Sequence, residues 1–273
     1  MLKIGLEERK KIQFDILCDI HSFCIENNIT YFLSSGTLIG AARHKGYIPW
    51  DDDIDIAMPR PDYDRFFKLY KSENYKAVDI DTDSTWPYIM GKVNDTRTTL
   101  KDDITGRGDE DIMVTHNDLG VHIDVFPLDG LPSCKLKCRF HLAKIYFLTF
   151  LVNRKTVSAK YSKGFMKKVF HYCMSMVLLP FKASQILSAK NSLVRKYDWN
   201  LSDLVSSLAT TTERKIFRKS LFSSVIEIPF EKKMFYAPVG YDEWLRIVFG
   251  DYMQLPPEEK RVCHSRCAYW KNA

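Results

Sequence analysis

The sequence predicts an α+β fold in which a small mixed sheet flanked by helices is followed by a helical, basic extension. Short β-rich segments alternate with helical patterns over the first 130 residues. A stretch rich in Lys and Arg comes next and has helical character. The chain of 273 residues is 45% hydrophobic and 27% charged, which is typical of a globular protein with a large core.

Residues 6–27 predict the first helix, because their large apolar side chains recur at the spacing of one helical face. A β-rich segment at 31–35 predicts a short buried strand, and residues 36–44 begin a second helix. Polar and apolar residues alternate over 53–58, as in a strand with one buried face. Pro61 then stands near the first turn of a helix, where proline is well tolerated.

The next segments complete the predicted sheet. Strands are expected at 76–82, 88–95 and 121–132. The polar, turn-rich residues 102–120 are expected to form a loop. Pro127 and the Asp129-Gly130 pair are expected to end the last of these strands, because Asp-Gly favours a turn. We therefore interpret Asp129 as a turn residue.

Charge divides the chain into an acidic and a basic part. Residues 51–129 carry 19 Asp and Glu against 9 Lys and Arg, whereas residues 131–197 carry 14 Lys and Arg and no Asp or Glu. The basic part has helical patterns that are interrupted at Gly164 and Pro180. This asymmetry indicates an acidic metal site and a basic surface that meets an anionic partner.

We expect a single domain over residues 1–273. Its core would span about 28–130, and the basic helical region about 131–220. The C-terminal segment, about 225–273, begins with a β-rich stretch, continues with a helix predicted over 241–253, and would pack back on the core.

The sequence also predicts a cytoplasmic location. The N-terminal residues are charged and lack the apolar centre of a secretion signal. No apolar run reaches the roughly 18 residues of a spanning helix. Seven cysteines, an odd number, favour reduced thiols in the cytosol.

Two groups of cysteines leave an alternative open. Cys134 and Cys138 form one group, and Cys263, His264 and Cys267 form the other. Their spacing permits a zinc site shared by both groups, but free thiols are the simpler interpretation.

Four aspartates crowd into the five residues 51–55. Like charges repel one another, so this segment is either a solvated turn or part of a cation site. Alternate residues of a strand face the same way, so Asp53 and Asp55 would point together, away from the core. Two such carboxylates can hold a divalent cation, with Asp51 and Asp52 in a supporting position or in a turn.

A Ser-Gly turn precedes these aspartates, between the predicted strand and helix. Its residues are Ser34, Ser35, Gly36 and Thr37. A glycine lets the backbone approach a ligand, and N–H groups and hydroxyls at a helix start bind phosphate well. Three basic residues, Arg43, His44 and Lys45, follow the turn. They either add positive charge to a phosphate site or complete a basic helix end.

Three stretches, at 34–60, 122–130 and 241–262, resemble the signatures of the LicD family of phosphorylcholine transferases. Fukutin-type ribitol-phosphate transferases are more distant relatives of that family. The resemblance covers about residues 32–262 and implies a nucleotidyltransferase-type fold. It also implies that a phospho-alcohol, usually phosphocholine, is transferred from a CDP-activated donor to a hydroxyl of a glycan.

By the same resemblance, Ser35 and Gly36 match the family's phosphate loop, Asp53 and Asp55 its metal aspartates, and Asp124 its third carboxylate. We expect Mg²⁺, with Mn²⁺ as an alternative, on these carboxylates. Such a cation would neutralise the pyrophosphate donor and stabilise the leaving CMP. Asp124 would either ligate the metal or accept the proton of the acceptor hydroxyl.

A choline headgroup is a quaternary ammonium, which binds the faces of aromatic rings. The available aromatic residues are Trp50, Trp86, Tyr88, Tyr236, Trp244 and Tyr252. Trp50 is the leading candidate because it adjoins the aspartates.

The basic stretch 135–196 has several interpretations. It carries no signature of nucleic-acid binding, so we expect no nucleic acid as a partner. Helices such as 165–179 mix apolar and cationic residues, which favours a surface at an anionic membrane over a merely solvated face. A peripheral position at the inner face of the plasma membrane is therefore an alternative to a free cytoplasmic one.

Together these observations predict a Mg²⁺-dependent transferase. It would move phosphocholine from CDP-choline to a lipid-linked or free glycan, such as a lipopolysaccharide, teichoic-acid or capsule precursor, and release CMP. One alternative changes the cargo to ribitol-, glycerol- or ethanolamine-phosphate. Another is a non-catalytic protein that binds cations on an anionic surface, which would bind metal without releasing CMP.

Overall fold

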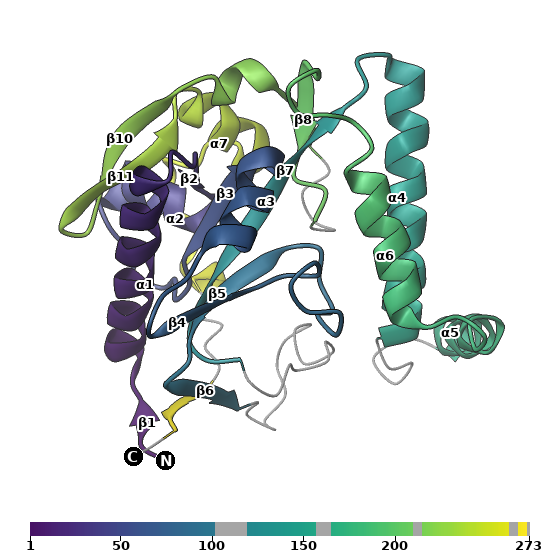
Figure 1. Cartoon of the computed structure of the whole chain (residues 1–273), viewed down its shortest axis with the longest axis horizontal. Helices are drawn as coiled ribbons and strands as arrows, with labels where there is room; N and C mark the ends of the chain where they lie inside the picture. Colours follow the sequence, from purple (N-terminus) through teal and green to yellow (C-terminus); the bar gives the residue numbers. More distant parts are fainter. Residues whose placement is uncertain (102–118, 157–164, 210–214, 262–266, 272–273) are drawn as a thin grey trace.

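The computed structural model of the chain describes residues 1–101, 119–156, 165–209, 215–261 and 267–271. Helices and strands are mixed along the chain, so the predicted α+β class is confirmed (Figure 1). Nearly all of the segment expected to form a loop at 102–120 lies outside the described residues. Within the described ranges, the helices are all too short or too polar to cross a lipid bilayer.

The central sheet is mixed, as predicted. Its main strands lie in the order β2 (Phe32–Leu33), β3 (Asp55–Pro59), β7 (His122–Leu131), β5 (Gly91–Asp95) and β4 (Tyr75–Val78). β3 and β7 run parallel, whereas the other neighbours run antiparallel. Two short strands, β8 (Leu204–Ser206) and β9 (Phe217–Arg218), extend the sheet from the far end of β7.

Helices α1 (Leu6–Glu26) and α3 (Arg60–Leu69) pack against this sheet (Figure 1). The predicted apolar stripe of α1 is buried, and a Cβ on Gly91 of β5 would meet the Phe67 ring of α3 at 2.1 Å. Gly91 and its alternate neighbours therefore face the helices. The residues between them, such as Lys92, project from the opposite face, and this second face carries the charged groups described below.

β7 nearly matches the strand predicted over 121–132, but the residues expected to end it lie inside it. It runs through Pro127 to Leu131, so the expected end at Pro127 and the interpretation of Asp129 as a turn residue are both wrong. The reason is a change of partners along the strand, because Asp129 pairs with Ser206 of β8. The Asp129 carboxylate is buried and accepts two hydrogen bonds from the Arg60 guanidinium, at 2.7 and 3.1 Å.

The C-terminal segment begins with a hairpin of β10 (Val225–Phe230) and β11 (Lys233–Pro238). The next helix, α7 (Tyr241–Phe249), ends at Gly250, whose φ of 72° favours glycine, and so it is shorter than predicted. Unpredicted strands β1 (Lys3–Ile4), β12 (Cys267–Trp270) and β6 (Thr98–Lys101) form a small sheet that brings the two chain ends together (Figure 1).

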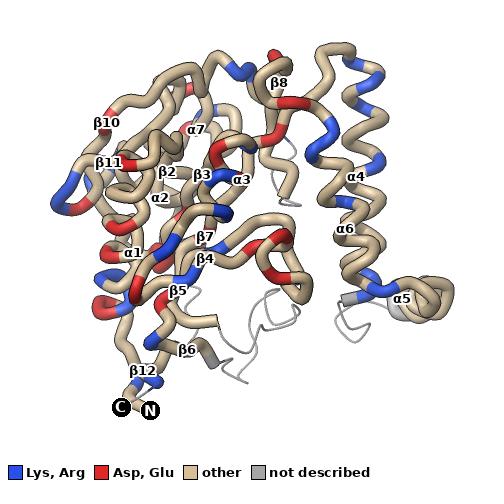
Figure 2. Tube along the Cα trace, in the orientation of Figure 1, with Lys and Arg blue, Asp and Glu red and all other residues tan. Residues whose placement is uncertain are grey.

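The basic region folds into helices α4 (Lys135–Thr156), α5 (Phe165–Val177) and α6 (Ala183–Val194). α4 and α6 pack side by side over a second, smaller hydrophobic cluster that includes Leu131 and Ile145. Pro180 lies between α5 and α6, as predicted, whereas Gly164 is outside the described residues. Figure 2 shows the Lys and Arg residues along these helices, without Asp or Glu among them.

Candidate active site

The start of β3 and the neighbouring part of β7 bring the predicted carboxylates together. Asp55 and Asp124 are register partners in the parallel pair, so their side chains share one face of the sheet. The N–H of Asp124 donates to the carbonyl of Ile54 at 3.0 Å, which extends this pairing toward Asp53. Asp53 lies just before the strand rather than inside it.

These carboxylates repel one another, which disfavours their ionised forms. Burial, followed by the charges of Asp51 and Asp124, raises the pKa of Asp53 to about 8. Burial and the charge of Asp53, followed by that of Asp124, raise the pKa of Asp55 well above its ordinary value. The side chain of Asp53 is exposed to solvent, so repulsion by the neighbouring carboxylates explains its raised pKa better than burial does.

Asp51 and Asp52 separate into different environments. A Cβ on Gly36 would lie 2.4 Å from Asp51 Oδ2, so the glycine allows the acidic loop to approach α2 (Ser35–Ile39). Asp51 also hydrogen-bonds with Asp53, and burial raises its pKa. Asp52 instead forms a buried ion pair with Arg9 of α1. Asp51 therefore joins the carboxylate cluster, while Asp52 anchors the loop to the core.

A buried lysine on β5 reaches the same face of the sheet. Lys92 is the register partner of Asp124, and its Nζ donates to Asp124 Oδ1 at 2.5 Å and to His122 Nε2 at 2.8 Å. The Nδ1 of His122 lies 2.8 Å from the carbonyl of Gly120, which fits a neutral ring that donates there and accepts from Lys92. Asp124 is therefore held in place and neutralised by a cation of the protein itself.

The raised pKa values of Asp53 and Asp55 are the observation that fits a bound cation, because a positive charge between them would remove the repulsion. Mg²⁺ commonly takes one or two carboxylates together with substrate phosphates. Asp124 fits such a role less directly, since Lys92 already neutralises it. In the parts of the chain that the structure describes, no three His, Cys, Asp or Glu side chains form a ready-made metal cluster.

The Ser-Gly turn leads from β2 into α2, which continues as a π-helical turn, η1 (Gly40–His44). Ser35 has a φ of 47°, a strained value for a residue with a side chain and one that is common at functional sites. The Thr37 hydroxyl accepts a hydrogen bond from the N–H of Asp55 at 2.9 Å. Thr37 thus positions the turn against the first residue of β3.

The three basic residues after this turn make different contacts. The Nη1 of Arg43 donates to the carbonyl of Tyr252 at 2.5 Å, and its Nε donates to His44 Nε2 at 2.9 Å. Lys45 is exposed, and its Nζ donates to the carbonyl of Ala42 at 3.2 Å, so it completes the helix end. Arg43 therefore ties the first signature stretch to the third.

Trp50 lies in a cationic environment. The guanidinium of Arg261 lies over its ring, 5.2 Å from the ring centre, and the ring of His44 meets it edge-on at 6.3 Å. Burial and the charge of Arg261 lower the pKa of Arg43. Trp50 thus has a face that holds a cation. Three other candidate aromatic residues, Trp86, Trp244 and Tyr252, are buried.

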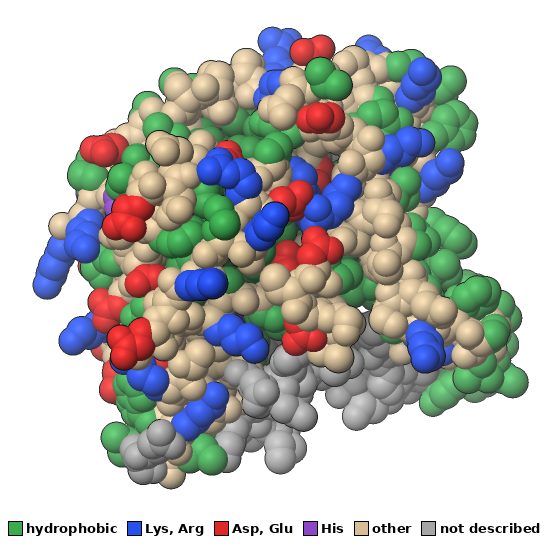
Figure 3. Space-filling view, viewed as in Figure 1, with side chains coloured by type: hydrophobic (Ala, Val, Ile, Leu, Met, Phe, Trp, Pro, Cys, Tyr) green, Lys and Arg blue, Asp and Glu red, His purple; other side chains and the backbone are tan. Residues whose placement is uncertain are grey.

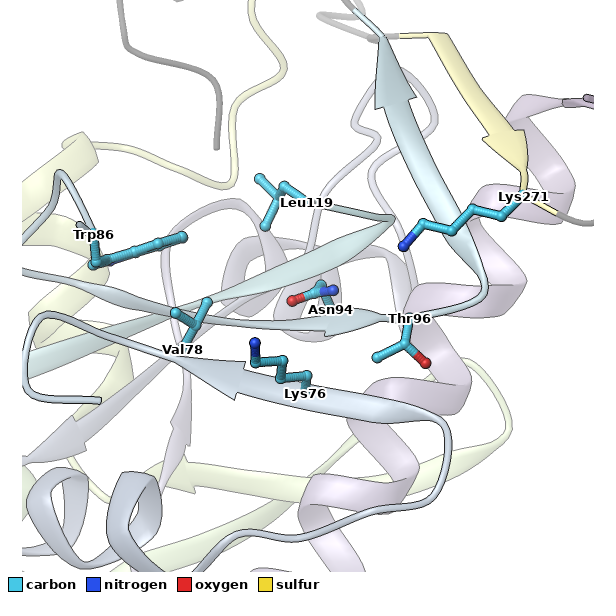
Figure 4. A pocket seen from close by; sticks show the side chains of 7 residues that line it. All are labelled: Lys76, Val78, Trp86, Asn94, Thr96, Leu119 and Lys271. Atoms are coloured by element: carbon cyan, nitrogen blue, oxygen red, sulfur yellow. The ribbon is translucent and has the colours of Figure 1, made fainter. Parts of the chain in front are cut away.

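A pocket of about 140 Å³ lies on the sheet face that carries Lys92, farther along β5 and β4. Asn94 of β5 is two residues from Lys92, and its register partners are His122 on β7 and Lys76 on β4. In Figure 4, Lys76 and Lys271 point toward the space above Asn94 from two different segments. The remaining lining residues are Val78, Trp86, Thr96 and Leu119.

The cysteines of the predicted zinc groups are only partly described. Cys134 and Cys138 are free thiols, one exposed and one buried, and Cys267 is half-buried at the start of β12. Cys263 and His264 lie outside the described residues.

Sequence reasoning missed three residues of this site: Lys92, His122 and Arg261. His122 could have been found, because the pattern His-x-Asp places it on the same strand face as Asp124. The approach of Lys92 depends on the register between β5 and β7. Arg261 depends on how the C-terminal segment folds back. Neither can be read from local spacing.

Comparison with known proteins identifies relatives of this chain. The family model described as "LicD/FKTN/FKRP, nucleotidyltransferase domain" matches residues 28–128. The lipopolysaccharide cholinephosphotransferase LicD of Haemophilus influenzae is 31% identical over 97% of both chains. An uncharacterized protein of Rickettsia typhi is 42% identical over 23% of this chain and 21% of its own length. One of Rickettsia prowazekii is 47% identical over 18% of each.

Proposed function

The chain belongs to the LicD family, and from this premise we propose that it transfers phosphocholine from CDP-choline to a glycan hydroxyl and releases CMP. The observation that carries the proposal is the group of Asp53, Asp55 and Asp124 at the paired ends of β3 and β7, beside the Ser-Gly turn. A nucleotidyltransferase-type fold is part of the proposal. The mixed sheet with its charged face supports it.

We propose that the carboxylates and the Ser-Gly turn bind different parts of the donor. Asp53 and Asp55 would hold Mg²⁺, or Mn²⁺ in its place, and Asp51 would support them. When bound, the cation supplies positive charge to the pyrophosphate and the departing CMP. Ser35 and Gly36 would present backbone N–H groups and a hydroxyl to a phosphate. Arg43 and Arg261 add a second region of positive charge next to Trp50.

The reaction joins the acceptor oxygen to the phosphorus that carries choline and breaks the bond from this phosphorus to the oxygen of CMP. The proton of the acceptor hydroxyl must leave as the new bond forms. Asp124 would accept this proton, because the ion pair with Lys92 keeps its carboxylate in place and in the ionised form that a base requires. This arrangement favours Asp124 as the base over Asp124 as a metal ligand.

The acceptor would lie over the pocket beside Asn94. The pocket continues the sheet face that carries Asp124, so an acceptor held there would bring a hydroxyl to the reacting group. Lys76 and Lys271 would attract an anionic acceptor, such as a phosphorylated glycan. The Haemophilus relative is named for action on lipopolysaccharide, which supports a glycan acceptor here.

The test is incubation of the purified chain with CDP-choline, Mg²⁺ and a phosphorylated oligosaccharide, followed by measurement of CMP and of choline on the glycan. We expect both products in equal amounts, and neither when a chelator removes the metal. CDP-ribitol, CDP-glycerol and CDP-ethanolamine serve as competing donors. A faster reaction with one of them would change the cargo but keep the enzyme class. Metal binding without CMP release from any donor would contradict the proposal in favour of a non-catalytic cation-binding protein.

A further inference from the structure

We propose that α5, together with the exposed side of α4, docks the protein on an anionic lipid bilayer. This surface lies apart from the carboxylate cluster, at the far end of the helical region (Figure 1). The proposal therefore stands on its own observations and does not depend on the transfer reaction.

Helix α5 is oriented so that polar side chains face helix α4. His171 is 2% exposed, and its Nδ1 lies 2.8 Å from the Nη1 of Arg154 on α4. The hydroxyl of Ser175, four residues later, donates to the carbonyl of Arg154 at 3.1 Å. These contacts fix which side of α5 faces α4. In a helix that packs on a globular core, the apolar side would face inward instead.

Among the side chains that the structure describes, the outward side of α5 is apolar. The large exposed side chains on it are Phe165, Met166, Val169, Phe170, Met176 and Val177, of which Phe165 is 79% and Met176 is 69% exposed. Successive residues of a helix are about 100° apart, so these six fall within about 140° of arc and form one continuous face. A contiguous apolar face of this kind marks an interaction site.

α4 extends this apolar surface. Leu136, Phe140 and Phe147 recur at helical spacing along it, and each is more than half exposed. Leu179 and Phe181, just after α5, are exposed as well. Figure 3 shows hydrophobic side chains over α4 and α5 along one edge of the molecule, with Lys and Arg among them.

Charge identifies the partner. The 67 residues from 131 to 197 contain 14 Lys and Arg and no acidic residue, so the apolar face is set in a purely basic region. A second copy of this chain would bring two basic regions together, which like-charge repulsion opposes. A nucleic acid would not cover large apolar side chains, because its binding surfaces are polar. An anionic bilayer matches both features, since it offers acyl chains below a negatively charged surface.

The experiment is vesicle flotation of the full chain. Vesicles of equal parts phosphatidylglycerol and phosphatidylcholine are compared with vesicles of phosphatidylcholine alone, at low and high salt. The test variant is Met166→Glu with Met176→Glu, at two exposed positions of α5 where glutamate is compatible with the helix. The matched control is Leu69→Glu with Leu201→Glu, which adds the same charge at exposed apolar positions outside this surface.

We expect wild type and the control to float with the anionic vesicles, and the α5 variant to bind about tenfold more weakly or worse. Binding should be weaker to neutral vesicles and should fall with salt. Equal binding of the α5 variant and wild type would overturn the proposal. So would a wild-type dimer, measured by analytical ultracentrifugation, that the α5 variant alone converts to a monomer. Circular dichroism of both variants checks that the helices remain folded.

Discussion

The sheet core and the α4–α5 surface each contain an arrangement that is unfavourable in the isolated protein, but of opposite kinds. In the core, apolar residues such as Val125 face inward and the charges gather on the second face, where Asp53 and Asp55 repel one another. In α5, Phe165 and Met176 face water while His171 is buried. We propose that each arrangement becomes favourable when a partner of matching chemistry binds. The partner proposed for the excess negative charge is a cation, and the partner proposed for the exposed apolar face in a basic region is an anionic membrane.

The largest effect should come from Asp55→Asn in the core, because this substitution should lower activity without lowering the stability of the fold. We expect CMP release to fall by about a thousandfold or more, because the variant loses several kcal/mol of charge stabilisation in the transition state. The metal-free variant should unfold at the same or a higher temperature than wild type, since one of the repelling charges is gone. The α5 variant should behave in the opposite way, losing membrane binding while keeping CMP release on a soluble acceptor. Full activity of Asp55→Asn would contradict the hypothesis that Asp53 and Asp55 hold the metal ion.

The next largest effect concerns the contact between the sheet core and the helical basic region, where Asp129 of β7 pairs with Arg60 of α3. Burial lowers the pKa of Lys190 on α6 to about 8, whereas the charge of Asp129 acts in the opposite direction. Asp129→Ala should lower the free energy of unfolding by about 3–5 kcal/mol, because it leaves the buried Arg60 with only the longer, partly exposed ion pair to Asp64 at 3.6 Å. Urea unfolding measures this change.

Two controls define the cause of that loss. The double variant Arg60→Met with Asp129→Leu should lose less stability than Asp129→Ala, since it removes both charges and keeps the volume. Asp242→Ala, which loses a solvent-open pair with Arg246 and a hydrogen bond from the Tyr252 hydroxyl, should lower the free energy of unfolding less, because no buried charge is left behind. A loss in the double variant equal to that in Asp129→Ala would point to packing rather than charge.

A smaller effect is the pH dependence of the carboxylate cluster. The pKa of Asp53 is about 8 in the metal-free fold against an ordinary value of 3.8, so the folded chain binds this proton more tightly than the unfolded chain. The free energy of unfolding without metal should therefore fall as pH rises from about 4 to 8. Mg²⁺ competes with the proton, so the rise in melting temperature caused by a fixed Mg²⁺ concentration should grow over the same window.

Thermal unfolding at pH 5.5, 7 and 8.5, with and without Mg²⁺, measures this dependence. Asp53→Asn should weaken this dependence, because the variant lacks one of the titrating carboxyls while Asp51 and Asp55 remain. A Mg²⁺ effect of the same size at all three pH values in wild type would contradict the assignment of Asp53 to the cation.

The two regions also differ in how far the sequence predicts them. In the core, the alternation at 53–58 and the Ser-Gly turn predict a strand and a helix, because local patterns decide both. The course of β7 beyond Pro127 and the approach of Lys92 depend on strand partners far away in the chain, which local patterns do not contain. In the basic region, the sequence predicts helical character and the break at Pro180, but not the bounds of the helices. The outward direction of the α5 apolar face depends on its contacts with α4 and becomes visible only in the structure.

The smallest effect tests whether the pocket beside Asn94 serves the acceptor rather than the donor. Lys76→Met removes one exposed charge while keeping most of the side-chain volume. We expect the KM for a phosphorylated acceptor to rise about two- to tenfold, since a solvent-exposed charge contact contributes little. The KM for CDP-choline and kcat should stay nearly constant, because Lys76 lies two strands away from Asp124. Lys68→Met, on the exposed side of α3, is the matched control. A rise in the KM for CDP-choline instead would assign this pocket to the donor, and the acceptor would then have to approach from the side of Trp50 and Arg261.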